Sequence, residues 1–386
     1  MKDGKICVGV VGAGWAGNVH AQAYNHVYGV GVDLKVVCAL EPTIPEFAAK
    51  YNFRSYTDDF NKVINDDEID VVDIITPPFL HKSMIIFALR AGKHVICEKP
   101  LTGYFGARGA QNVGDTSRAV MLTQVRQDLE EIEAVLKETR KKFFYSENWI
   151  YSPAFRRACE LIRMKGTTVL EMRSLIGHKG SQAAYVKYWS KSGGGTGLRN
   201  ITHPLSTALY LKRLEMEAKG KTFGIKSIYC DCAQVTSDVD KGYVLADPDD
   251  TEDWSHAVIT FTDGTKATIT AGDIYIGGAV NEFEIYGSDA SYKCNFSQST
   301  LLEAYFSDSK GLEDTEVLEK SDGNIGYQRA DVSAEFIRGY DAEIQDFMEC
   351  IKYDREPICG FDIAKVSSEL VYLGYLSAEQ NRRIDL

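Results

Sequence analysis

The chain has 386 residues, of which 44% are hydrophobic and 25% are charged, and its formal net charge is -12. These values are typical of a globular protein of about two domains. The acidic balance argues against a nucleic-acid partner, because such partners require Lys and Arg gathered on one face. No window approaches the ~18 consecutive apolar residues of a membrane span, and no signal-peptide pattern opens the chain. We therefore expect a cytoplasmic protein with reduced cysteines.

From Lys5 to about residue 147, apolar strand-like runs alternate with helical patterns. The runs read ICVGVVG, LKVVCAL, VVDIIT and HVICE. Strands rich in Val and Ile that alternate with helices predict a parallel, doubly wound sheet. We place this first domain at residues 1–147, with an extended Gly-rich loop over about 103–126.

The pattern changes beyond residue 147. Segments such as TTVLEMRSLIG and HAVITFTDGTKATITAG alternate polar and apolar residues, and TDGT marks a hairpin turn. Two amphipathic helices over 341–353 and 364–381 close the chain. Residues 148–386 are thus predicted to form an α+β domain on a largely antiparallel sheet. Its nearest cysteine pair, Cys230 and Cys232, is expected to face opposite sides of a strand, so no metal site is predicted.

A glycine pattern follows the first strand directly. Gly12, Gly14 and Gly17 spell GxGxxG before a helix, where the backbone can approach a pyrophosphate and the helix N-terminus attracts its charge. Glu41, at the end of the second strand, would accept hydrogen bonds from the adenosine ribose and repel a 2′-phosphate. This favours NAD over NADP; the alternative is a glycine turn in a fold without a nucleotide.

In a doubly wound sheet, ligands bind outside the carboxyl ends of the strands. The third strand ends in ITPPFLH and the next in HVICEKP, so both turns should border the cofactor. The residues predicted to contact it, besides the glycines and Glu41, are Trp15, Ala16, Thr76, Pro77, His81, Glu98 and Lys99.

Three motifs in this order, GVVGAGWAG, ITPPFLH and CEKPL, resemble the glucose-fructose oxidoreductase/inositol dehydrogenase/MocA family of nicotinamide-dependent sugar and polyol oxidoreductases. The similarity continues through ENWIYSPAF, IGHKGS, SGGGTG and YLSAEQNRRIDL. It implies a Rossmann domain followed by an open, mixed-sheet domain for substrate binding and oligomerisation. It also implies a homo-oligomer, either a dimer, a tetramer or larger, and NAD that is either held tightly or released at each turnover.

The resemblance implies that Lys99 lies between the nicotinamide ribose and the reacting hydroxyl, with Pro100 often preceded by a cis peptide. In isolation, Lys99 could equally be a strand-end lysine that reaches water. His203 occupies the family's histidine position, but Arg199 stands where the family has an aspartate four residues earlier. A guanidinium there would lower the imidazole pKa and favour a neutral base. We expect a helix to begin at Pro204, so Arg199 and His203 need not share a face.

The roles of several further residues stay open between alternatives. Arg199 is a ligand for substrate or phosphate, a surface residue, or a catalytic group. His178 in IGHKGS is a rival base or a surface histidine, and Gly177 and Gly180 would let its loop approach a ligand. Asn148 contacts substrate or caps a turn. The aromatic residues that form either a sugar-facing wall or core are Tyr151, Tyr185, Tyr188 and Trp189.

These features predict an NAD-dependent enzyme that oxidises a secondary hydroxyl of a sugar, glycoside or polyol by hydride transfer to nicotinamide. The stretch CEKPLTGYFG resembles a subgroup of bacterial enzymes that oxidise C3 of glucosides, and we expect the substrate to be a C- or O-linked glucoside. Three alternatives stay open: an inositol or other polyol dehydrogenase, a glycoside hydrolase that uses NAD transiently, and a non-catalytic NAD-binding regulator.

Overall fold

The computed structural model describes residues 4–181, 183–297, 303–306, 326–329 and 337–386. Its first sheet has six strands in the order β3-β2-β1-β4-β5-β6, and all neighbouring pairs are parallel. The predicted parallel, doubly wound sheet is therefore confirmed. The strands are β1 (Lys5–Val11), β2 (Gly31–Cys38), β3 (Ser55–Thr57), β4 (Val71–Ile74), β5 (His94–Glu98) and β6 (Phe143–Ser146).

Helices cover both faces of this sheet, which is why its Val and Ile side chains are buried in the central strands. The predicted loop over 103–126 is shorter in the structure, because α5 already begins at Arg118. The helical segments of this part are α1 (Trp15–His26), α2 (Ile44–Tyr51), α3 (Phe60–Ile64), η1 (Pro78–Leu80), α4 (His81–Arg90), η2 (Val113–Asp115) and α5 (Arg118–Thr139).

The second sheet has seven strands in the order β12-β11-β7-β10-β9-β8-β15. Only β7 and β10 pair in parallel, and the other neighbours are antiparallel, so the predicted mixed, largely antiparallel sheet is confirmed. Its strands are β7 (Val169–Gly177), β8 (Ile225–Ala233), β9 (Trp254–Phe261), β10 (Lys266–Gly272), β11 (Val280–Gly287), β12 (Ser291–Asn295) and β15 (Ile384–Asp385). A separate antiparallel pair joins β13 (Glu303–Phe306) and β14 (Gly326–Arg329).

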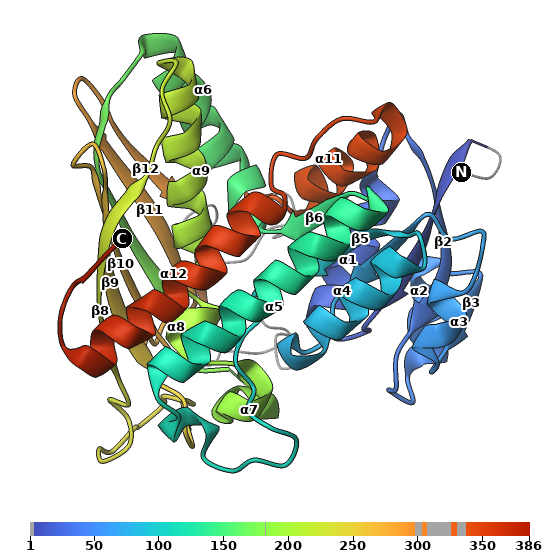
Figure 1. Cartoon of the computed structure of the whole chain (residues 1–386), viewed down its shortest axis with the longest axis horizontal. Coiled ribbons are helices and arrows are strands. Elements are labelled where there is room, and N and C mark those ends of the chain that lie inside the picture. Colours follow the sequence, from blue (N-terminus) through green and yellow to red (C-terminus); the bar gives the residue numbers. More distant parts are fainter. Residues whose placement is uncertain (1–3, 182, 298–302, 307–325, 330–336) are drawn as a thin grey trace.

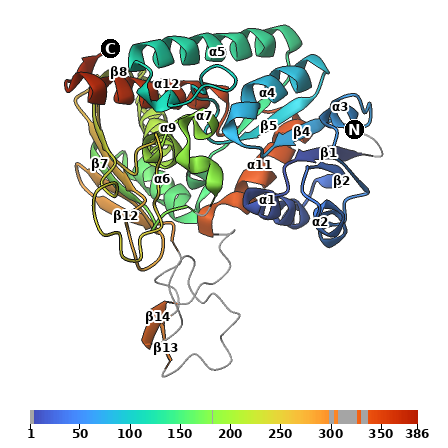
Figure 2. The same cartoon turned by 90° about the horizontal axis from the view of Figure 1, so that it is seen from below.

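The second sheet carries helices on one face (Figures 1 and 2). Along β9 every second residue is buried, as expected for a strand with one face against a core. The helical segments of this part are η3 (Asn148–Tyr151), α6 (Pro153–Lys165), η4 (Ala184–Lys187), α7 (Trp189–Ser192), α8 (Thr196–Arg199), α9 (Thr202–Ala218), α11 (Tyr340–Tyr353) and α12 (Phe361–Gln380).

The two C-terminal helices tie the sheets together. α11 packs on α1 of the first part, and α12 lies between α5 and β8 (Figure 1). Gln345 on α11 contacts both the backbone N–H and the carbonyl of Tyr28, each at 3.0 Å. α11 therefore follows six of the seven strands of the second sheet in the chain but packs beside the first sheet. The division between residues 147 and 148 stays a prediction.

The expected orientation of Cys230 and Cys232 is wrong. Their sulfur atoms lie 3.7 Å apart, because residues two apart on a strand share a face. No group of three or more His, Cys, Asp or Glu suited to hold a metal is found within the described residues. None of the helices in that part of the chain has the length and apolar character of a membrane span.

Candidate active site

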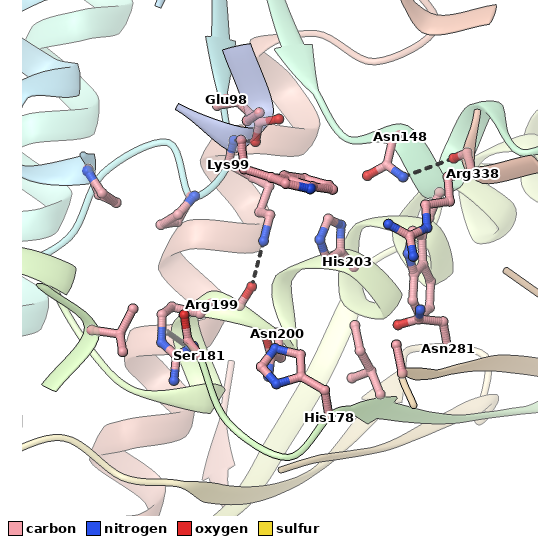
Figure 3. A pocket seen from close by; sticks show the side chains of 18 of the residues that line it. Glu98, Lys99, Asn148, His178, Ser181, Arg199, Asn200, His203, Asn281 and Arg338 are labelled. Atoms are coloured by element: carbon pink, nitrogen blue, oxygen red, sulfur yellow. Dashed lines mark hydrogen bonds between the residues drawn. The ribbon is translucent and has the colours of Figure 1, made fainter. Parts of the chain in front are cut away.

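A cavity of about 300 Å³ lies where the carboxyl edge of the first sheet faces the second domain (Figure 3). Three parts of the chain build it. The first sheet contributes the segments after β1, β4, β5 and β6, and the second domain contributes the loop after β7 with α8, α9 and the start of β11. The segment that leads into α11 adds Arg338 and Tyr340. The cavity thus joins distant parts of the sequence at the edge where a doubly wound sheet binds ligands.

The glycine turn between β1 and α1 is shaped for a close approach. Gly12 has a φ of +119°, and a Cβ there would lie 2.5 Å from the Ile75 carbonyl oxygen. A Cβ on Gly17 would lie 2.6 Å from the Gly12 oxygen, whereas a Cβ on Gly14 would meet no atom within 4 Å. Gly14 therefore faces open space directly before the N-terminus of α1, which is the arrangement that receives a pyrophosphate.

The structure places some of the other predicted cofactor contacts at the cavity and others away from it. Trp15, Ala16, Thr76, Glu98 and Lys99 all line the cavity. The acid predicted to end the second strand is placed differently: β2 stops at Cys38, and Glu41 is exposed in the following turn.

Two predicted cofactor contacts in the ITPPFLH turn, Pro77 and His81, do not line the cavity. Pro77 accepts a hydrogen bond from the Leu80 N–H. The ring of His81 is fully buried, with Nδ1 at 2.9 Å from the Pro100 oxygen and Nε2 at 2.7 Å from the Thr76 oxygen. His81 thus holds the two cavity-lining turns together, and both of its nitrogens are occupied by backbone.

Lys99 leaves β5 at the centre of the cavity. The Lys99–Pro100 peptide is cis, as the resemblance implies. The Nζ atom donates a hydrogen bond to the Arg199 carbonyl oxygen at 2.9 Å (Figure 3). Burial lowers the pKa of the Lys99 ammonium from its ordinary value, against the opposing charges of Glu98 and Glu147. A buried amine held by one carbonyl is available to hydrogen-bond a ligand.

A buried ion cluster supports Lys99 from behind. His20 lies between two carboxylates, with Nδ1 at 2.9 Å from Asp73 Oδ2 and Nε2 at 3.3 Å from Glu98 Oε1. Burial opposes charge on this ring, but the two carboxylates outweigh it and raise the pKa of His20 well above its ordinary value. Glu98 in turn accepts the Lys99 N–H at 2.9 Å. The imidazolium of His20 therefore fixes the strand end that carries Lys99.

His203 enters the same cavity from α9. The helix begins at Thr202 rather than at Pro204, which places His203 in its first turn. Its Nδ1 lies 2.5 Å from Oε1 of the fully buried Glu147, and its ring stacks on Trp149 at 5.5 Å and 11°. Burial lowers the pKa of His203; Glu147 opposes this shift, and Lys99 adds to it.

Arg199 points away from His203. Its Nη2 donates to Asp273 Oδ2 at 2.6 Å, and its side chain is only 12% exposed, so it is not a surface residue. Arg199 is also not what lowers the pKa of His203, since burial and Lys99 have that effect. The aspartate expected from the resemblance is thus replaced by an arginine with an acid partner of its own.

His178 lies on the loop after β7, on the far side of the cavity from Lys99 (Figure 3). Its Nδ1 accepts the Gly180 N–H at 3.0 Å, while Asp273 Oδ1 is 3.8 Å away, beyond hydrogen-bond reach. The predicted role of the neighbouring glycines is different: a Cβ on Gly177 would lie 2.0 Å from the Gly272 oxygen, and one on Gly180 would meet the backbone of residue 246. Both glycines accommodate neighbouring chain, and Gly177 also lines the cavity.

The weaker substrate candidates are also divided. Asn148 lines the cavity and donates to the Arg338 carbonyl oxygen at 2.9 Å (Figure 3). Tyr151 is buried away from it, with its hydroxyl 2.8 Å from Asp346. Trp189 is also buried, beneath the Arg118 guanidinium. These two aromatic residues therefore belong to the core.

Several lining residues carried no signal in the sequence. Glu147 and Trp149 flank the predicted Asn148 in the ENWIYSPAF stretch, but the resemblance gives them no role, and the Arg338 segment lies far along the chain. The polar and aromatic lining residues that the sequence did not single out include Trp149, Asn200, Asn281, Arg338 and Tyr340. Only the ENW stretch offered a hint, since it places an acid directly at a strand end.

The fold and the cavity define an oxidoreductase built on a nucleotide-binding Rossmann domain. Two family models match the chain: an oxidoreductase family, NAD-binding Rossmann fold, over residues 6–123, and the C-terminal alpha/beta domain of the same family over residues 213–386. The chain belongs to the glucose-fructose oxidoreductase/inositol dehydrogenase/MocA family. The prediction of an NAD-binding domain is thereby confirmed.

Named relatives show what kind of proteins the chain is similar to. It is 40% identical to a levoglucosan dehydrogenase of Pseudarthrobacter phenanthrenivorans over 101 residues, which span 24% of this chain and 26% of that protein. It is 22% identical to the uncharacterized oxidoreductase YrbE of Bacillus subtilis over 79% of this chain and 78% of that one. Among solved structures, GenD2 from gentamicin A biosynthesis, in complex with NAD, superposes with a TM-score of 0.78 at 22% identity, covering 99% of this chain and 96% of that one. The fold is thus shared over the whole chain.

Proposed function

We propose that the protein oxidises a secondary hydroxyl of a sugar, glycoside or polyol to a ketone, with transfer of a hydride to NAD. The observation that carries the proposal is the meeting of Lys99 and His203 in one cavity at the carboxyl edge of the nucleotide-binding sheet. A hydroxyl can be oxidised by hydride transfer only if a base takes its proton. Bound NAD supplies the hydride acceptor.

The hydrogen bonds support different tasks for the two histidines. Nδ1 of His203 faces the Glu147 carboxylate, so it carries the proton and leaves Nε2 free to accept one. Nδ1 of His178 accepts an N–H, so in the neutral ring the proton is on Nε2, which can only donate. We therefore assign His203 as the base and His178 as a hydrogen-bond donor to the substrate.

Lys99 is the other side chain expected to act on the reacting hydroxyl. Its ammonium can donate one hydrogen bond to the substrate oxygen while another of its N–H groups keeps the hydrogen bond to the Arg199 carbonyl oxygen. As the hydroxyl proton moves to His203 Nε2, negative charge grows on that oxygen, and the adjacent cation stabilises it until the hydride leaves the carbon and the neutral carbonyl forms. Oxidation then yields a ketone, a reduced nicotinamide and a protonated His203.

For the substrate, we propose a glucoside, C- or O-linked, that is oxidised at C3. Two features support this choice: the CEKPLTGYFG stretch, and the likeness to a levoglucosan dehydrogenase. The cavity wall offers amide groups suited to sugar hydroxyls, from Asn148, Asn200 and Asn281. An inositol is the second candidate, because its ring presents similar secondary hydroxyls.

The test is to incubate the purified protein with NAD+ and a panel of C- and O-glucosides, free sugars and inositols, and to follow NADH absorbance. A 3-keto glucoside from at least one glucoside is the expected product. Reduction of NAD+ by inositols alone would indicate that the substrate is an inositol. Release of free aglycone without net NADH would identify a hydrolase, and NAD+ binding without turnover on the whole panel would indicate a regulator.

A further inference from the structure

We infer that Glu147 is the positioning residue of His203: it selects the ring's tautomer and stabilises the imidazolium that forms when the substrate proton is taken. This inference rests on the proposed function, because it concerns the base of that reaction. The resemblance gives Glu147, the first residue of the ENWIYSPAF stretch, no role at the histidine, and the acid that it implies stands at the position of Arg199. In this chain the carboxylate reaches the histidine from a different element.

The geometry supports Glu147, instead of an acid at position 199, as the carboxylate partner of His203. Glu147 follows β6 directly, so its carboxylate emerges at the same sheet edge as Lys99, and Oε1 lies 2.5 Å from His203 Nδ1. Trp149, two residues further on, stacks on the same ring. The 146–149 segment thus fixes both the plane and the direction of the imidazole. Arg199 is held by Asp273 and does not contact that ring.

The burial of Glu147 also argues against a purely structural role. The residue is fully buried, and Oε2 has no hydrogen-bond partner within the described part of the chain. A buried carboxylate with so few partners costs free energy, and an apolar residue would stabilise the fold better. Such a group is explained when it balances a charge that appears during turnover.

The first test is an NMR titration of His203 in ¹⁵N-histidine-labelled full-length protein, with the signal assigned through His203→Asn. The charged groups facing the ring are Glu147, Lys99 and Glu98. Because Glu147 favours the charged ring, Glu147→Gln should lower the titration midpoint of His203 by about 1 pH unit or more. Glu215→Gln is the matched control: Glu215 is equally buried on the same helix as His203 and pairs with Lys212 at 2.6 Å, and its loss should leave the midpoint unchanged.

The second test is turnover with NAD+ and the best substrate of the panel. Glu147→Gln should lower kcat by about 100-fold, within the range of general-base effects, with little change in NAD+ affinity. Glu147→Asp keeps the charge but lengthens the contact, so its kcat should lie between those of the wild type and Glu147→Gln. If the Gln variant does not fold, the Asp variant provides the test. An unshifted His203 titration, or wild-type kcat in either folded variant, would overturn the inference. A panel without any turnover would instead contradict the proposed function, and the NMR titration would still decide on Glu147.

Discussion

Histidines occupy three different environments at this cavity, and their hydrogen-bond partners decide what each ring can do. His20 lies between two carboxylates and carries a charge. His178 accepts a backbone N–H and can therefore donate only from its other nitrogen. His203 has one carboxylate partner and faces the cavity with its second nitrogen. The residue type alone does not distinguish the three rings; their neighbours do.

Lys99 is expected to act on the reacting oxygen rather than on the fold. Lys99→Met should lower kcat by about 100-fold or more, because it removes the cation that stabilises the developing charge. NAD+ affinity, followed by quenching of tryptophan fluorescence, should change little, since the glycine turn holds the pyrophosphate. As a control, Lys93→Met removes a buried lysine that donates to the Asp66 carbonyl oxygen outside the cavity and should retain kcat. A Lys99→Met variant with full turnover would contradict the mechanism.

The two cavity histidines should separate in steady-state kinetics. His203→Asn removes the base, so kcat should fall by 100-fold or more on the general-base scale of ~10²–10⁴. His178→Asn removes one hydrogen bond to the substrate, so KM should rise by about tenfold, the effect of ~1.4 kcal/mol, and kcat should change less. Comparable losses of kcat in both variants, or the reverse split, would show that the assignment of base and donor is wrong.

The acid limb of the pH profile should report His203. Burial and Lys99 lower its pKa below the ordinary value of 6.5, and the reaction needs the neutral ring. Activity should therefore persist as the pH falls through 6.5 and decline only when the pH passes the lower folded-state pKa of His203. The measurement is kcat/KM against pH with a non-ionising glucoside. A midpoint above 6.5 would mean that Glu147 outweighs burial.

At the scale of elements, the turns of the first sheet could be predicted and the opposite wall could not. GxGxxG, ITPP and EKP each come directly after a strand, so local sequence places them at one edge. Asn148 and Arg338 meet although 190 residues separate them, and Glu147 reaches His203 from another element. Such contacts depend on how two sheets pack, which periodicity does not encode. For the same reason Tyr151 and Trp189 could not be told from wall residues.

The glycine turn offers a matched pair of substitutions. Gly14→Ala adds a methyl group where no atom lies within 4 Å, so the fold should keep its Tm while NAD+ affinity falls by about tenfold or more, as the methyl occupies the approach of the pyrophosphate. Gly12→Ala forces a side chain at a φ of +119° against the Ile75 oxygen, so its Tm should fall by several degrees. Thermal unfolding and fluorescence titration check both. A Gly14→Ala protein with unchanged affinity would show that the pyrophosphate does not approach this turn.

At the scale of the whole molecule, the cavity depends on both sheets and on the C-terminal helices that join them. The first sheet provides the nucleotide-binding edge, and the second domain provides both cavity histidines. α11 brings Tyr340 back beside Trp15, with ring centroids 6.4 Å apart. Since α11 also packs on α1, segments that lie far apart in the sequence line the cavity together.

The second sheet leads to a prediction about assembly. Its helices lie on one face (Figure 1), and the other face presents half-buried side chains such as Val258, which pairs with Thr268 on the next strand. We expect this face to form a homo-oligomer, because a stable interface buries ~1,200–2,000 Å² and a broad sheet supplies such an area. Val258→Arg should then reduce the mass measured by light scattering to that of one chain, since a charge would be buried without a partner. Val120→Arg, on the exposed side of α5, is the matched control and should keep the wild-type mass. A monomeric wild-type protein, or equal masses for wild type and Val258→Arg, would contradict this interface.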